Sequence, residues 1–453
     1  MTNWLIDRIN NYSDRIFLSD RTHSYSYSDL NISIKSSLKN FKNAGIKAGD
    51  IVILNGDYNI KSIASLLALF TMKAIVAPLS SVAKNEFTKC VEASKAEWKI
   101  STLNQIKINQ LQQNAKKNEL VNTLKERNES GLILFSSGST GTPKAMIHSA
   151  KSFLKRFETK RPKNLRILIF LLFDHIGGIN TLFNSLSTAS QIIVPKNRDP
   201  NNVATAIEKY QVNLLPASPT FLNLLLISGV HKKHDLSSLR YITYGTEPMP
   251  ESLLNRIKSE FPKTRLIQTF GTSETGISQT SSKSSSSTLI KFDDPNTEYK
   301  IVRGELWIRS KTQILGYLNH NMNRFTKDGW FKTGDILEPE KENEDNGFFR
   351  IVGRTQEIIN VGGEKVNPSE VENILLGIPE VIDCIVYAEE NAITGQIVAA
   401  EIVIKDGSEE KITKRYIKNY CRDRLSSFKV PARIIYKQST EFSKRFKKIR
   451  LNK

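Results

Sequence analysis

The segment GLILFSSGSTGTPKAM, residues 131–146, combines residue types that suit the binding of a triphosphate. An apolar run ends at Phe135, and serines, threonines and glycines then lead to Pro143 and Lys144. Glycines let successive backbone N–H groups point toward one anion, hydroxyl groups add donors, and the lysine adds positive charge. The lysine does not follow the second glycine as it does in GxxxxGKS/T, so the loop differs from that motif. A flexible linker is a poor explanation, because the segment directly follows a strand-like run and ends in Pro-Lys.

Other short motifs lie on both sides of this loop. SYSYSDL and AGIKAGDIVIL precede it, and after it come LFDHIGG (172–178), YGTEPMP (244–250), QTFGTSETG (268–276), GELWI (304–308), GYLN (316–319), GWFKTGD (329–335) and FFRIVGRTQEIINVGGEKVNPSEVE (348–372). In their order and spacing these motifs resemble those of the adenylate-forming superfamily, which includes acyl- and aryl-CoA synthetases, the adenylation domains of peptide synthetases, and luciferases. The resemblance covers the chain from about Tyr25 to its end.

The resemblance implies an acid–thiol ligase of the AMP-forming, acyl-CoA synthetase type. Such an enzyme activates a small carboxylic acid with ATP, releases pyrophosphate, and passes the acyl group from the adenylate to a thiol. The implied cofactors and partners are ATP, Mg²⁺, and either coenzyme A or the pantetheine of an acyl carrier protein. Two alternatives stay open: a stand-alone amino-acid adenylation enzyme, and a catalytically weakened homologue that binds a nucleotide or an acyl ligand.

Attack of a carboxylate on ATP builds negative charge on the α-phosphate, so the site needs cations, N–H donors and a metal-binding carboxylate. Matched motif by motif, the resemblance implies that the loop holds the β- and γ-phosphates, with Thr140 and Lys144 as the principal side chains. Glu274 would hold Mg²⁺, and Ser273 would contact the α-phosphate. The full set of implied ATP-binding residues is Ser136, Ser137, Gly138, Ser139, Thr140, Gly141, Lys144, Gly245, Thr246, Glu247, Pro248, Thr269, Phe270, Gly271, Thr272, Ser273, Asp335 and Arg354.

Three of these residues have separate implied roles on the nucleoside. Phe270 stands where the family usually has tyrosine, and its aromatic face would lie against the adenine. Asp335 would accept hydrogen bonds from the two ribose hydroxyls, because a carboxylate offers two acceptor oxygens. Arg354 would assist from the junction between two domains.

The implied catalytic residues are Lys144, Glu274 and a lysine near the C-terminus. The family ends in a pattern such as PxTxxGKxxR, whereas the tail here is EFSKRFKKIRLNK, without that proline or glycine. Counting without gaps from Pro431 selects Lys447, whereas matching the apolar residue after the lysine selects Lys448. A solvated basic tail without a catalytic role is the alternative.

The acyl pocket is expected at the LFDHIGG motif. By resemblance its walls include His175, Gly177, Gly178 and Thr246, with His175 as a gate. Asp174 permits a second interpretation, because amino-acid adenylation domains place an aspartate near this position to bind an α-amino group. The phrase HIGG favours the acyl- or aryl-CoA pattern.

The elements that must position these residues follow an α/β rhythm. Short apolar runs at 51–54, 131–135, 166–173, 191–194 and 240–244 alternate with longer amphipathic ones, which predicts mostly parallel sheets flanked by helices. We expect a large ATP- and acyl-binding domain over residues 1–353 and a small mobile α+β domain over 354–453. The family resemblance places the pivot between them at Gln356. The serine-rich segment 280–288 is expected to be an exposed loop.

Bulk composition indicates a soluble globular enzyme. The N-terminus, MTNWLIDRIN, mixes acidic and basic residues before any long apolar run, which argues against a secretory signal and predicts a cytoplasmic location. The three cysteines are scattered, which indicates neither a disulfide framework nor a zinc site. The longest apolar stretch, 63–79, is interrupted by Lys73 and is too short to span a membrane. The net charge of +19 comes from lysines spread along the whole chain, so no specific nucleic-acid partner is predicted.

Overall fold

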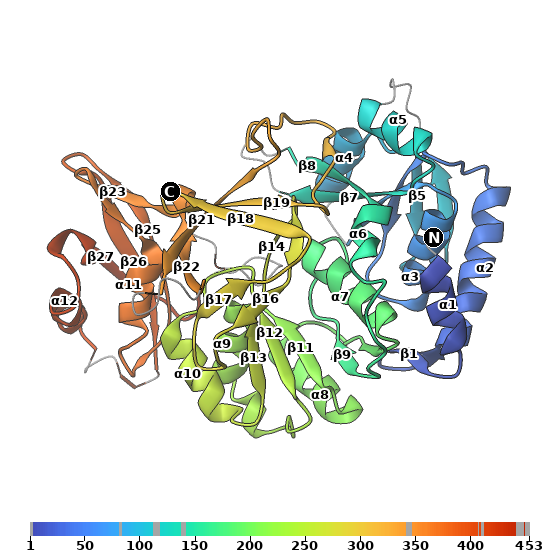
Figure 1. The fold of residues 1–453 in the computed structure, drawn as a ribbon. Coiled ribbons are helices and arrows are strands. Elements are labelled where there is room, and N and C mark those ends of the chain that lie inside the picture. The colour runs from blue at the N-terminus through green and yellow to red at the C-terminus, as the bar shows by residue number, and fades with distance from the viewer. Residues whose placement is uncertain are drawn as a thin grey trace.

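The computed structural model describes residues 3–80, 84–111, 118–136, 142–340, 347–405, 407–408, 412–440 and 448. Two seven-stranded sheets form most of the N-terminal part of the chain (Figure 1). The first has the strand order β20 (Gly316–Tyr317), β8 (Lys144–Ser149), β7 (Gly131–Ser136), β4 (Ile75–Leu79), β3 (Ile51–Asn55), β5 (Trp98–Ser101) and β6 (Lys107–Gln110). The second has the order β13 (Arg265–Gln268), β12 (Tyr241–Tyr244), β11 (Leu214–Ala217), β9 (Arg166–Leu168), β10 (Gln191–Ile193), β1 (Ile16–Ser19) and β2 (Ser24–Ser26).

The strands of the second sheet from β13 to β1 are parallel, as are β7, β4, β3 and β5 of the first. Antiparallel pairs lie toward the edges, at β20 with β8, β8 with β7, β5 with β6, and β1 with β2. Strand β4 is buried along its whole length. A parallel strand covered on both faces is expected to be apolar throughout, which explains why these runs could be identified in the sequence.

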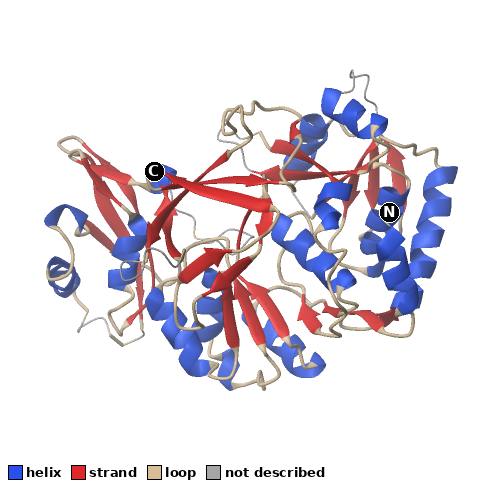
Figure 2. Cartoon of the chain, viewed as in Figure 1, coloured by secondary structure: helices blue, strands red, loops and turns tan. Residues whose placement is uncertain are grey.

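Helices cover the faces of both sheets (Figure 2). They are α1 (Asn3–Asn11), α2 (Tyr27–Asn43), α3 (Ile60–Thr71), α4 (Lys84–Ser94), α5 (Glu119–Glu126), α6 (Ala150–Lys155), α7 (Ile176–Ser187), α8 (Pro200–Tyr210), α9 (Pro219–Ile227) and α10 (Glu251–Glu260), with a 3-10 turn at Val230–Lys232. The apolar stretch 63–79 is divided between helix α3 and strand β4, with Lys73 at a positive φ of 61° in the turn. No helix among the described residues is long and apolar enough to cross a membrane.

A third, six-stranded sheet joins the large part of the chain to its C-terminal part. Its order is β16 (Thr280–Ser282), β17 (Leu289–Phe292), β22 (Phe349–Arg354), β21 (Phe331–Pro339), β19 (Glu305–Ser310) and β18 (Thr297–Val302). All of its pairs are antiparallel, unlike those at the centres of the first two sheets. Strand β19 alternates between buried and partly buried residues, as expected for a sheet that packs on one face.

The expectation that residues 280–288 form only an exposed loop was wrong for their first three residues. Strand β16 pairs with β17, and the serines bind the edge of β13. The N–H of Gln268 donates to Ser282 Oγ at 2.8 Å, and the N–H of Leu266 donates to Ser285 Oγ at 3.1 Å. Serine hydroxyls can replace a missing neighbouring strand, so a polar composition here does not mean that the segment is free of the sheet.

The C-terminal part is a separate five-stranded sheet with two helices, drawn in orange and red at one end of the molecule (Figure 1). Its elements are β23 (Ile359–Val361), β24 (Glu364–Val366), α11 (Pro368–Leu375), β25 (Val381–Asn391), β26 (Gly395–Ile404), α12 (Lys414–Arg422) and β27 (Arg433–Tyr436), with 3-10 turns at Thr355–Glu357 and Ser427–Lys429. Gly362 and Gly363 connect β23 and β24 with φ values of 59° and 93°. Two successive positive φ angles suit glycine and close a tight hairpin.

The predicted fold class is confirmed: sheets flanked by helices form the large part, and an α+β unit with its own apolar core forms the smaller one. The core of the large part lies between the first sheet and helices α2, α3 and α7, with a second core around β11, β12 and α8–α10. The predicted boundary at 353/354 falls at the end of β22.

Candidate active site

The described phosphate-binding candidates, Ser136 and Lys144, lie on two paired strands of the first sheet. Ser136 ends β7, Lys144 begins β8, and the two residues are paired across the strands. Ser137, Gly138, Ser139, Thr140 and Gly141 lie outside the described residues. The side chain of Asn319 holds the backbone on both sides of Lys144: it accepts from Ala145 N at 2.9 Å and donates to Pro143 O at 2.8 Å.

Glu274 lies in the turn between β14 (Phe270–Thr272) and β15 (Gly276–Ser278). Its carboxylate accepts a hydrogen bond from Tyr317 Oη at 3.1 Å, and its backbone carbonyl accepts from Ile314 N at 2.8 Å. Thr272 stabilises the turn, since its hydroxyl accepts from Thr275 N at 3.1 Å. The predicted metal carboxylate is therefore fixed at both its backbone and its side chain.

Ser273 is held by a histidine from the first sheet. The imidazole Nε2 of His148, on β8, lies 2.9 Å from Ser273 O. His148 is 1% exposed, and burial lowers its pKa to about 4. The ring is therefore neutral near pH 7, and Nε2–H donates to the carbonyl.

Asp335 and Arg354 form an ion pair across strands β21 and β22. They are paired in register, and Arg354 Nε lies 2.9 Å from Asp335 Oδ1. Asp335 is buried, whereas the Arg354 side chain is half-exposed. The charge of Asp335 raises the pKa of Arg354 against the effect of burial, and the charges of Glu357 and Glu274 act in the same direction. The ribose candidate, its arginine and the metal carboxylate thus share one electrostatic environment.

The adenine-side motif 245–248 follows β12. A Cβ on Gly245 would lie 2.5 Å from Thr269 O, so only glycine fits there. Thr246 has a φ of 77°, which is unusual for a non-glycine residue, and its buried Oγ1 has no partner within the described structure. Glu247 Oε1 accepts from Thr220 N at 2.7 Å, at the start of α9. A strained residue with an unpaired buried hydroxyl fits a site that a ligand completes.

Other predicted nucleotide residues have mainly structural contacts. The Phe270 ring is 7% exposed and packs edge-on against Phe292, so adenine could reach only a small part of it. Thr269 donates to Tyr244 O through both its N–H and its hydroxyl. A Cβ on Gly271 would lie 2.8 Å from Gly276 O, which requires glycine in the β14–β15 hairpin.

The acyl-site candidates surround the start of α7. His175 is the N-cap residue, and its Nδ1 accepts from Gly177 N at 3.4 Å. A Cβ on Gly178 would lie 2.0 Å from Leu172 O and 2.5 Å from Tyr58 Oη, so the helix can approach only with glycine here. The Asp174 carboxylate accepts hydrogen bonds from the N–H and from the hydroxyl of Ser80, the residue that follows β4.

Only one of the two candidate C-terminal lysines belongs to the described residues. Lys447 lies outside the described residues. Lys448 Nζ lies 3.0 Å from Asp383 Oδ1 and donates to Cys384 O at 2.6 Å, with only 11% of the side chain exposed. Burial alone would lower the pKa of Lys448, but the nearby carboxylates of Asp383 and Glu372 outweigh it and raise the pKa.

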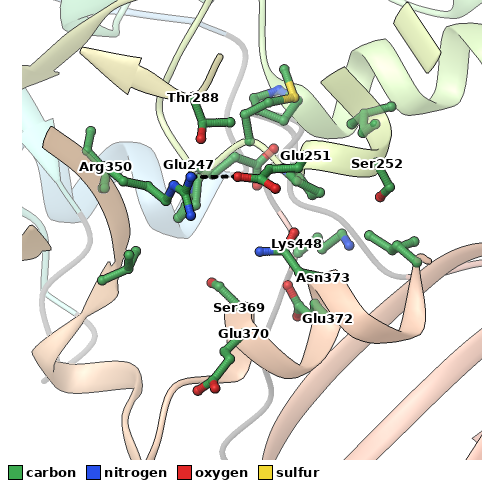
Figure 3. Close-up of a pocket in the computed structure, with 18 of the residues that line it drawn as sticks. Glu247, Glu251, Ser252, Thr288, Arg350, Ser369, Glu370, Glu372, Asn373 and Lys448 are labelled. Carbon is green, nitrogen blue, oxygen red and sulfur yellow. Dashed lines mark ion pairs between the residues drawn. The ribbon is translucent and has the colours of Figure 1, made fainter. Parts of the chain in front are cut away.

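A cavity of about 390 Å³ lies between α9 and α10 of the large part and α11 of the small part (Figure 3). Figure 3 shows the ion pair between Glu251 and Arg350 on one side, with Lys448 near Glu372 and Asn373 on the other. Glu247 and Pro248 line it, whereas Lys144, Glu274 and Asp335 do not. The cavity therefore adjoins the adenine-side motif and is separate from the phosphate and metal candidates.

The structure brings Ser273, Glu274 and the backbone beside Lys144 into contact with three residues that were not predicted as site residues. These are His148, Tyr317 and Asn319. A period of two along β8 places His148 on the same face as Lys144, a signal that was present in the sequence. Tyr317 and Asn319 belong to the GYLN motif, which was noted without a role. Their contacts depend on the pairing of β20 with β8, which local patterns do not encode.

Comparisons with known proteins cover most of the chain. The AMP-binding enzyme family model matches residues 5–318, and the AMP-binding enzyme C-terminal domain model matches 370–444. A 2-succinylbenzoate–CoA ligase from Bacillus licheniformis is 25% identical, with 95% of this chain and 94% of that protein covered. The probable CoA ligase CCL5 from Humulus lupulus is 29% identical, over 62% of this chain and 55% of its own length. The chain thus spans less than two thirds of that plant relative.

Two solved structures share the fold. The amide bond synthetase McbA from Marinactinospora thermotolerans superposes with a TM-score of 0.81 at 20% identity, covering 97% of this chain and 96% of that one. The o-succinylbenzoate CoA synthetase MenE from Bacillus subtilis, solved with an acyl-adenylate intermediate, gives 0.76 at 20% identity, covering 99% and 97%.

Proposed function

The chain belongs to the AMP-binding enzyme family, and we propose that it activates a small carboxylic acid with ATP and transfers the acyl group to a thiol. The first step would form an acyl-adenylate and release pyrophosphate. The second would transfer the acyl group to coenzyme A or to the pantetheine of a carrier protein. The CoA ligase from Bacillus licheniformis, which matches nearly end to end, supports a thiol acceptor.

The observation that carries this proposal is the arrangement around Glu274. Tyr317 orients its carboxylate through a hydrogen bond. The negative charges of Asp335 and Glu274 both raise the pKa of Arg354. Glu274 would hold Mg²⁺, which neutralises phosphate charge when bound. Lys144 would add positive charge at the phosphates, and Asp335 would bind the ribose hydroxyls. We assign the remaining candidates of the phosphate loop and the adenine-side motif to the same ATP site.

The HIGG motif around His175 favours an acyl or aryl acid as the substrate. The Asp174 carboxylate accepts two hydrogen bonds from Ser80, and both end on Oδ2. Its buried Oδ1 has no hydrogen-bond partner among the described residues, so an acceptor remains that a substrate ammonium could use. We therefore propose an acyl or aryl acid that enters beside His175, Gly177, Gly178 and Thr246, with an amino acid as the alternative that the panel below tests.

Carboxylate-dependent exchange between ATP and pyrophosphate tests the first step. A panel of aliphatic, aryl and amino acids should contain at least one acid that supports exchange, and aliphatic or aryl acids should be preferred. Glu274→Ala should reduce that exchange by roughly 10³, because a metal ligand contributes several kcal/mol to transition-state stabilisation. Glu298→Ala, on the exposed side of the third sheet, is the matched control and should leave exchange unchanged.

The second step is tested by adding an acceptor to the acid that supports exchange. Coenzyme A should yield a thioester, whereas a primary amine should yield little amide. Amide formation without a thioester would overturn the thiol assignment. A protein that binds ATP but exchanges pyrophosphate with no acid in the panel would instead be a catalytically weakened homologue.

A further inference from the structure

Strand β20 contacts both the metal-site turn and the phosphate-loop strand, and no substrate-binding or catalytic role is proposed above for its residues. It pairs antiparallel with β8, with Tyr317 opposite Met146. Continuing this register places Asn319 opposite Lys144. Directly opposed residues of an antiparallel pair project from the same face, so Tyr317 and Asn319 share a face with Lys144 and His148.

Tyr317 acts on the side chain of Glu274. Its hydroxyl lies 3.1 Å from Glu274 Oε1, and the tyrosine is 7% exposed. A phenolic hydroxyl carries one proton to donate, and here the carboxylate of Glu274 is its acceptor. A glutamate held in this way loses rotational freedom before any cation arrives, which lowers the entropic cost of binding one.

Asn319 acts on the backbone around Lys144. Its amide accepts from Ala145 N and donates to Pro143 O, so it mimics a strand residue where the phosphate loop joins β8. Leu318 N also donates to Ala145 O at 2.9 Å. The lysine therefore leaves the sheet from a backbone that is fixed on both sides.

We propose that Tyr317 and Asn319 are positioning residues that hold the metal carboxylate Glu274 and the phosphate-loop Lys144 in one fixed arrangement. This inference rests on the proposed function, since it takes Glu274 as the Mg²⁺ ligand and Lys144 as a phosphate contact. Tyr317 at the end of β20 and Asn319 two residues later thereby join groups that lie far apart in the sequence. The same strand pair also carries His148, which holds the neighbouring Ser273 carbonyl.

Tyr317→Phe tests the first half of the proposal, because it removes the hydroxyl and keeps the ring. Mn²⁺ can replace Mg²⁺ as a paramagnetic probe, and its affinity is measured by electron paramagnetic resonance with a non-hydrolysable ATP analogue bound. The variant should bind Mn²⁺ about 10-fold more weakly, the usual cost of losing an outer-shell partner. Saturating metal should restore most of the exchange rate, which a purely structural defect would not allow.

Asn319→Ala tests the second half. The ATP analogue should bind about 10-fold more weakly, because the backbone on both sides of Lys144 loses a hydrogen bond. Tyr436→Phe is the control for both variants and matches Tyr317→Phe, because it removes a hydroxyl hydrogen bond to Ile412 O in the small part. It should leave the affinities for Mn²⁺ and for the ATP analogue unchanged.

Several outcomes separate this inference from the proposed function. If Glu274→Ala abolishes Mn²⁺ binding while Tyr317→Phe binds as wild type, the positioning role of Tyr317 is wrong and the metal assignment stands. If Glu274→Ala itself binds Mn²⁺ normally, the metal assignment fails first. Wild-type analogue affinity in Asn319→Ala would overturn the role of Asn319.

Discussion

Lys448 and Lys447 are adjacent, but their side chains need not share a role. Lys448 neutralises two buried acidic groups of the small part, Asp383 and Glu372. A lysine that is committed in this way would have to break the pair before it could reach a substrate carboxylate. We therefore favour Lys447 as the catalytic lysine, which the ungapped count from Pro431 also selects.

A measurement of stability and a measurement of rate should distinguish the roles of the two lysines. Lys448→Met should destabilise the protein by about 3 kcal/mol, because it leaves a buried carboxylate without its partner. Lys447→Ala should keep the stability of the wild type but slow adenylate formation by roughly 10² to 10³. Thioester formation from a supplied acyl-adenylate should survive in Lys447→Ala.

The control for this comparison is Lys429→Met, since Lys429 lies 2.7 Å from Glu370 of the same small part and the Glu370 side chain is 44% exposed. A pair whose carboxylate stays solvated contributes little, so urea unfolding should detect a change of no more than about 0.5 kcal/mol. Equal destabilisation by Lys429→Met and Lys448→Met would show that Lys448 has no special structural role.

His148 gives a second prediction, in the pH dependence of stability. Its pKa is about 4 in the folded protein, whereas a free histidine has about 6.5. Between these values the unfolded chain binds a proton that the folded chain does not, so stability falls as the pH is lowered. At roughly 1.4 kcal/mol per pKa unit, the loss from pH 7 to pH 4 is about 3 kcal/mol.

His148→Gln is the comparison protein, because the amide of glutamine can still donate to Ser273 O but does not titrate. Unfolding in urea at a series of pH values should show a steeper acid loss in the wild type than in the variant. Parallel pH profiles for the two proteins would contradict the assignment of a neutral, buried imidazole.

At the scale of single elements, burial decided what the sequence could predict. The apolar runs at β3 and β7 were located because strands buried on both faces leave a continuous signal. Segment 166–173 was expected as one strand, but β9 ends at Leu168. Ile169, Phe170 and Phe173 are buried beyond its end, and hydrophobicity alone cannot distinguish a buried loop from a strand.

The serine-rich segment beside β13 provides a prediction for an element. Ser282→Ala and Ser285→Ala each remove the acceptor of a strand N–H, and each should cost about 1 kcal/mol of stability. Ser286→Ala is the matched control, because this serine is exposed in the same segment. Thermal unfolding should rank the two bonding positions below the control. Identical melting temperatures for all three variants would contradict the role of these serines at the sheet edge.

At the scale of the whole molecule, the sequence motifs identified the candidate groups but not how they are held. Glu274, Asp335 and Arg354 were all candidates, and the structure places them in one electrostatic environment. The contacts from Tyr317 and Asn319 could not be predicted, because they depend on the pairing of β20 with β8, which lie far apart in the sequence. The strand period places His148 on the face of Lys144, but its contact with Ser273 depends on how the β14–β15 turn packs against β8. Contacts between the two parts, such as Asn223 Nδ2 to Ile382 O at 3.2 Å, depend in the same way on the fold.

The predicted pivot at Gln356 can be tested through the rates of the two half-reactions. Gln356 is exposed in the 3-10 turn Thr355–Glu357, between the last strand of the third sheet and the first strand of the small part. If the small part rotates between half-reactions, Gln356 must change its backbone angles, and proline would fix φ at about −65°. Proline should therefore hold the small part in one orientation. In Gln356→Pro, the half-reaction that needs a different orientation should be slower by about tenfold or more, and the other half-reaction should keep its rate.

Gln356→Ala is the control and should leave both rates near those of the wild type. The two rates are measured separately, as pyrophosphate exchange and as thioester formation from supplied adenylate. Equal losses in both would indicate a folding defect, and no loss in either would place the pivot elsewhere.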